Sequence, residues 1–83
     1  MLCFEVVING SIACVAGSSE RGGLSAIIHH YTLSNSAILT LGGLLDEKHV
    51  YWIEPGQIAL SAGDELIIRF VETDTADTPR PDQ

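Results

Sequence analysis

The chain has little positive charge. Its 83 residues include four Lys and Arg against eleven Asp and Glu, so the formal net charge is −7. Proteins that bind nucleic-acid phosphates need clustered cations, whereas the cations here stand singly at Arg21, Lys48, Arg69 and Arg80. We therefore expect no direct binding to nucleic acid or to a membrane. We expect a protein partner instead, and a basic surface would suit this acidic chain.

Cysteines and long apolar runs are also scarce. Cys3 and Cys14 form no CxxC pair, and two thiols cannot complete a structural zinc site. No stretch reaches the roughly 18 apolar residues that a membrane span requires. The N-terminal apolar run lacks a preceding Lys or Arg and contains Glu5, unlike an export signal. These features predict a cytoplasmic protein with reduced thiols.

Among the signals that are present, the clearest is Asn9-Gly10, a pair that prefers the type I′ turn of a two-residue β-hairpin. The apolar segments 2–8 and 11–17 flank this turn, and we interpret them as paired strands. The simplest register places Val6 opposite Ala13, so the even-numbered residues of the first strand share the core face with Ala13 and Val15. Cys3 and Cys14 then lie on the opposite face as diagonal neighbours, too far apart for an easy disulfide.

The segment 24–33 fits two structures. Leu24, Ile27, Ile28 and Tyr31 follow the spacing of an amphipathic helix. However, Ile, Tyr and Thr residues favour a pleated strand, and the polar turn 34–36 leads directly into another apolar run at 37–41. We favour a strand hairpin, and one short helix at 24–31 is the alternative.

Further strand-like segments follow at 49–53, 57–60 and 65–72, separated by turn residues. Short strands at this spacing predict an all-β fold, a small antiparallel β-sandwich or barrel of six to seven strands. We expect a single β-rich domain over residues 1–72. Residues 73–83 are predicted to form an acidic, flexible C-terminal tail, because Ala76 is the one apolar side chain there apart from two prolines.

Several short segments together carry a family resemblance. They are Gly42-Gly43-Leu44, Trp52, Gly63-Asp64-Glu65 and Val71-Glu72-Thr73-Asp74. In this order they resemble a group of small uncharacterised bacterial proteins, a domain of unknown function. The resemblance implies a stand-alone bacterial domain and supplies no catalytic residue.

The histidines are the first candidates for chemistry. His29 and His30 are adjacent and point to opposite faces of a strand, so they cannot both bind one ion there. His29 on one strand, with His49 and Glu54 on or beside another, are the candidate metal ligands, although we expect no metal or other cofactor. An alternative function is therefore a small-ligand or metal-binding protein that uses His29, His49 and the aromatic residues Tyr31, Tyr51 and Trp52.

Arrangements typical of enzymes are missing from the sequence. No Gly-x-Ser-x-Gly segment is present, and both cysteines have apolar neighbours. The carboxylate of Glu5, opposite Cys14 in the predicted register, would raise a thiol pKa rather than lower it. We expect no catalytic residue and a non-enzymatic function.

Apolar residues on the second faces of the predicted strands point to protein contacts. Ile27, Tyr31, Ile67 and Val71 are the candidate interaction residues, because no core on their own side is predicted to cover them. A second sheet or another subunit would cover such positions, so homodimerisation through an edge strand or a sheet face is a hypothesis. The sequence therefore predicts an acidic all-β protein–protein interaction module.

Overall fold

The structure is a computed structural model that describes residues 1–53 and 56–81, and these residues form eight β-strands and no helix. The strands are β1 (Leu2–Ile8), β2 (Ser11–Ala16), β3 (Gly22–Tyr31), β4 (Ser36–Leu45), β5 (Lys48–Tyr51), β6 (Gln57–Leu60), β7 (Leu66–Glu72) and β8 (Arg80–Pro81). The segment 24–31 lies within β3, which pairs with β4, so the expected strand hairpin is confirmed and the helical alternative is wrong.

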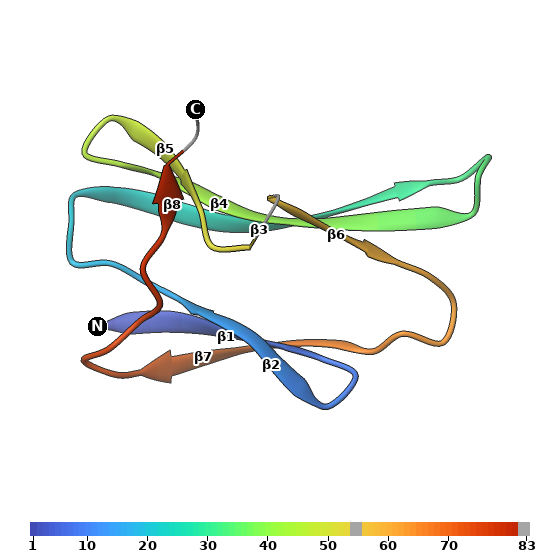
Figure 1. Ribbon diagram of the computed structural model, residues 1–83, viewed down its shortest axis with the longest axis horizontal. Helices are drawn as coiled ribbons and strands as arrows, with labels where there is room; N and C mark the ends of the chain where they lie inside the picture. Colours follow the sequence, from blue (N-terminus) through green and yellow to red (C-terminus); the bar gives the residue numbers. More distant parts are fainter. Residues whose placement is uncertain (54–55, 82–83) are drawn as a thin grey trace.

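The strands form two antiparallel sheets that lie as two layers (Figure 1). The three-stranded sheet has the order β2-β1-β7, and the five-stranded sheet has the order β3-β4-β5-β8 with β6 also paired to β4. β5 and β6 lie end to end beside β4, because β5 pairs with residues 42–45 and β6 pairs with residues 37–40. The predicted all-β fold is confirmed, and it is a small sandwich.

The turn of the first hairpin forms as predicted. Asn9 and Gly10 both have positive φ, at 51° and 83°, as a type I′ turn requires. Asn9 also ties this turn to the one that precedes β7, because its Oδ1 accepts the backbone N–H of Glu65 at 2.8 Å and its Nδ2 donates to Asp64 at 3.1 Å. The backbone N–H of Ser61, and then the Asn9 amide, hold the pKa of the Asp64 carboxyl below its usual value.

The predicted register of this hairpin is wrong beyond the residues next to the turn. A β-bulge adds Ala13 to β2, so Val6 pairs with Cys14 rather than with Ala13. One extra residue exchanges the faces of all side chains that follow it. Cys14 and Ala16 therefore point into the core, in the place predicted for Ala13 and Val15.

The core lies between the two sheets and is centred on β4. Leu39 and Leu41 are both 0% exposed, because β4 has paired strands on both sides and a second sheet over its inner face. The buried cluster consists of Val6, Cys14, Ala16, Leu39, Leu41, Leu45, Trp52 and Ile53. Complete burial of one leucine side chain stabilises a fold by about 1.5–3 kcal/mol, so β4 makes a large contribution.

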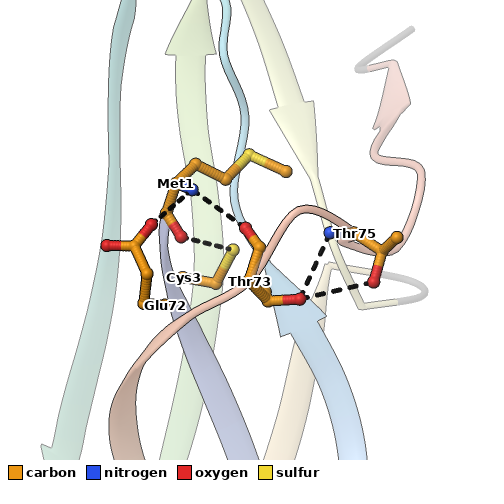
Figure 2. Close-up of polar contacts among 5 residues, drawn as sticks. All are labelled: Met1, Cys3, Glu72, Thr73 and Thr75. Atoms are coloured by element: carbon orange, nitrogen blue, oxygen red, sulfur yellow. Dashed lines mark hydrogen bonds and ion pairs between the residues drawn. The ribbon is translucent and has the colours of Figure 1, made fainter.

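After β7 the chain leaves the three-stranded sheet. Figure 2 shows this point: the Met1 nitrogen donates to the Thr73 carbonyl at 2.9 Å and forms an ion pair with the Glu72 carboxylate. The backbone N–H of Thr75 donates to Thr73 Oγ1 at 3.2 Å, a local turn that redirects the chain. In Figure 1 the segment then crosses to the other layer, where β8 pairs with β5. The segment predicted as a tail thus contacts both sheets, and its flexibility stays a prediction.

The position of β4 gives a test with matched substitutions. We expect Leu39→Ala to lower the free energy of unfolding by about 2–5 kcal/mol, because it removes buried methyl groups and leaves a cavity. Leu33→Ala makes the same chemical change at a fully exposed side chain and should change stability by less than about 0.5 kcal/mol. Urea denaturation of both variants measures the difference, and equal losses would contradict the placement of the core.

Candidate functional site

The four candidate interaction residues lie on two separate surfaces. Ile27 and Tyr31 are on the outer face of β3 and are 56% and 45% exposed. Ile67 and Val71 are on the outer face of β7, half-buried beside their β1 neighbours. The two outer faces belong to different sheets, so the four residues form no common patch. Ile27 and Tyr31 are the more exposed pair.

The candidate metal ligands are not brought together. His29 pairs with Ile38 of β4 and His49 pairs with Leu44, so their positions along β4 differ by six residues, or about 20 Å. Glu54 lies outside the described residues. Within residues 1–53 and 56–81, no group of three or more His, Cys, Asp and Glu side chains could hold a metal ion. The ring of His29 instead packs against that of Tyr31, with centroids 4.3 Å apart.

The aromatic residues are also divided. Trp52 is 6% exposed in the core, and its Nε1 donates to the backbone carbonyl of Asp77 at 3.2 Å, so it offers no surface to a ligand. Tyr51 lies over Gly42, its neighbour on β4, where an added Cβ would come within 3.0 Å of the ring. An aromatic ring that covers a cross-strand glycine restores packing that the glycine lacks.

Cys14 is unsuited to nucleophilic catalysis. Burial, and then the negative charge of Asp77, raise its thiol pKa to about 11. A nucleophilic cysteine needs the thiolate form near neutral pH, which this environment opposes. Cys3 and Cys14 are both free and buried, in agreement with the expectation that they form no disulfide.

Most edges of the two sheets are covered or charged. At the edge of β2, Asp77 donates its backbone N–H to the Val15 carbonyl at 2.9 Å, and its carboxylate accepts the Val15 N–H at 2.9 Å. β7 carries Arg69 and Glu72, and the outer strand beside β5 is β8, which is short and contains Pro81. Charges, prolines, short strands and covering segments are the usual devices that keep a sheet edge from pairing with other strands.

The edge formed by β3 has none of these devices. β3 is ten residues long, pairs with β4 without a register shift, and has no other pairing partner among the described residues. Residues 22–45, which include both strands, contain no Asp, Glu, Lys, Arg or Pro. We call the free backbone side of residues 22–31 the β3 edge. It combines unpaired backbone groups with exposed apolar side chains and no charge.

A hollow lies next to the β3 edge on the outer face of the five-stranded sheet. Its volume is about 410 Å³, and Gly23, Gly42 and Gly43 are among its lining residues, together with the side chains of Ser25, Thr40, Leu44, His49 and Tyr51. An added Cβ at Gly23 would meet no atom within 4 Å, so the hollow is open there. We call it the outer-face hollow. Tyr51 covers Gly42, but no ring covers Gly23.

Comparisons with family models, with curated proteins and with solved structures found no match to this chain. None of the described residues forms a helix long and apolar enough to cross a membrane.

Two features of the site were missed by reasoning from the sequence. The β3 edge had a signal, because an uncharged run from 22 to 45 in a chain of net charge −7 marks a segment without the usual edge protection. Asp77 had no such signal. Its contacts reach Val15 and Trp52, far away in the sequence, and no local pattern encodes them.

The raised pKa of Cys14 gives a test of this packing. The folded state holds the thiol proton up to about pH 11, whereas an unfolded thiol loses it near pH 9.0. The stabilisation is therefore complete below pH 9 and is lost as the pH rises toward 11. We expect the stability of the wild-type protein to fall more steeply over this interval than that of Cys14→Ala, as measured by urea denaturation. Identical slopes for the two proteins would contradict the buried environment of Cys14.

Proposed function

We propose that the chain is a non-enzymatic protein-binding module and that it binds a partner by strand addition at the β3 edge. One observation carries the proposal: β3 is a long, regular, uncharged edge strand, whereas the other edges described above are covered, short or charged. An extended segment that pairs with such an edge gains a row of backbone hydrogen bonds, and alternate side chains contact each face.

The side chains of β3 support this use of the edge. Ile27 and Ile28 are each 56% exposed, on opposite faces of the strand, and Tyr31 and Leu33 extend the apolar surface toward the β3–β4 turn. A strand added beside β3 would cover part of both isoleucines. Exposed apolar residues at an edge favour association, because their burial removes apolar area from water.

The distribution of charge restricts the kind of partner. All eleven acidic residues lie outside residues 22–45. A partner at the β3 edge therefore needs no basic surface, and the complex should depend only weakly on salt, since screening acts on charges. A basic partner, which the net charge suits, would contact other parts of the surface.

Peptide selection tests the proposal without a known partner. A displayed library of random peptides is selected on the immobilised protein and on its Ile27→Lys variant. The lysine adds a charge that an incoming strand would have to desolvate, so we expect it to weaken the selected peptides by about tenfold or more, a loss of about 1.4 kcal/mol. The selected peptides should be uncharged and rich in β-branched and aromatic residues.

Ile12→Lys is the matched control. Ile12 is 62% exposed on β2, in the other sheet, so the same substitution should leave peptide binding unchanged. Circular dichroism establishes that both variants keep the wild-type fold. Peptides that bind all three proteins equally well would argue against strand addition at β3, and so would a selection that yields none on a monomeric protein.

A further inference from the structure

We infer that the strand which pairs with the β3 edge is β3 of a second copy of this chain, in an antiparallel register centred on Ile27. This inference rests on the proposed function and names its partner. The two copies would be related by a two-fold axis perpendicular to the sheet. The five-stranded sheet of one copy would then continue into that of the other.

An edge strand is complementary to itself under this symmetry. A two-fold axis perpendicular to the sheet makes the strands antiparallel and keeps the inner and outer faces on their own sides. A pair of regular strands over residues 23–31 would exchange about eight to ten backbone hydrogen bonds. The ten-residue β3 pairs with β4 without a bulge, so its free side offers the uninterrupted length that such pairing needs.

The side chains select the register centred on Ile27. On the outer face, Ile27 would lie opposite its copy, Ser25 opposite His29, and Gly23 opposite Tyr31. On the inner face, Ala26 would lie opposite Ile28. Leu24 would lie opposite His30, also on the inner face. The pairs Gly23–Tyr31, Ser25–His29 and Ala26–Ile28 each join a small side chain to a larger one, a favourable cross-strand arrangement.

The outer-face hollow supports the same register. Tyr31 of the second copy would lie beside Gly23, where the hollow is open and an added Cβ meets no atom within 4 Å. The protein already uses this arrangement within one chain, where Tyr51 covers Gly42. The hollow would therefore be closed by a ring from the partner, in the way that aromatic residues commonly cover cross-strand glycines.

Neighbouring registers fit less well. A centre at Ala26 leaves Tyr31 beyond the end of the paired strands and places Ile27 opposite Ser25. A centre at Ile28 places the two Ile28 side chains opposite each other and leaves Gly23 without a neighbour. Neither register covers Gly23 with a ring.

Charge favours a second copy as the occupant. Two chains of net charge −7 repel each other wherever their acidic residues meet. The β3 edge belongs to residues 22–45, which contain no Asp, Glu, Lys or Arg, so pairing there brings no charged side chain of the strand against its copy. Charge repulsion between two copies is therefore weakest when they meet at their β3 edges.

Light scattering coupled to gel filtration is the first test. We expect the wild-type protein and Ile12→Lys to have twice the monomer mass of 8.9 kDa, and Ile27→Lys to have the monomer mass. A wild-type protein that stays at 8.9 kDa at every concentration would overturn the inference. So would a dimer that Ile27→Lys leaves intact.

Engineered cysteines test the register. Ile27→Cys would face its own copy and should form a disulfide-linked dimer in a glutathione buffer. Ser25→Cys is the control, because its copy would lie four residues further along the strand, about 13 Å away and beyond disulfide reach. Equal cross-linking of the two variants, or cross-linking of Ser25→Cys alone, would overturn this register. The native thiols of Cys3 and Cys14 are buried and compete little.

The peptide selection separates this inference from the proposed function. If the protein is monomeric and binds extended peptides at β3, the proposed strand addition stands and the inference that a second copy is the partner fails. If the protein is monomeric and binds no peptide, both the proposed function and this inference fail. A dimer that dissociates with Ile27→Lys and cross-links through Ile27→Cys supports both.

Discussion

The pairing of β4 is the interaction on which the rest of the structure depends. β4 is hydrogen-bonded along its full length to β3 on one side, and to β5 and β6, placed end to end, on the other. This double pairing accounts for the complete burial of Leu39 and Leu41. It also leaves β3 at the edge of the five-stranded sheet, because a strand paired only with β4 has a second side that nothing else in the described chain occupies. The core and the candidate binding edge are therefore two results of one arrangement.

Several features of the fold were predictable because their causes are local. Alternating apolar residues indicate strands, and Asn9-Gly10 specifies a turn with two positive φ angles. The extra residue at Ala13 was not predictable, because alanine fits a strand with or without a bulge and only the packing of Cys14 and Ala16 shows where it lies. The contacts of residues 73–81 were not predictable for a related reason: their polar composition indicates solvent exposure, whereas several of their hydrogen bonds are to groups distant in the sequence.

The candidate sites also differ in whether local sequence determines them. The sequence placed Ile27 and Tyr31 on a free strand face, and the alternation that predicted this is local. It could not reveal that His29 and His49 are about 20 Å apart, because that separation depends on which strands flank β4 and in which register. Trp52 differs again. It is one of the aromatic residues of the small-ligand alternative, but it lies in the core, as single tryptophans of small β-domains commonly do.

The contact between Asp77 and Val15 has a consequence for the size of any assembly. It occupies the backbone N–H and carbonyl of Val15 on the outer side of β2, so this edge of the three-stranded sheet is covered at its centre while β3 is open. Two-fold pairing uses the β3 edge of both copies and ends at two subunits, because the other edges described above are covered, short or charged. A chain cleaved before Asp77 would lose this cover on β2, and contacts between unlike edges, such as β2 with β3, do not close on themselves. The segment after β7 would thereby act as a stop against growth into fibres.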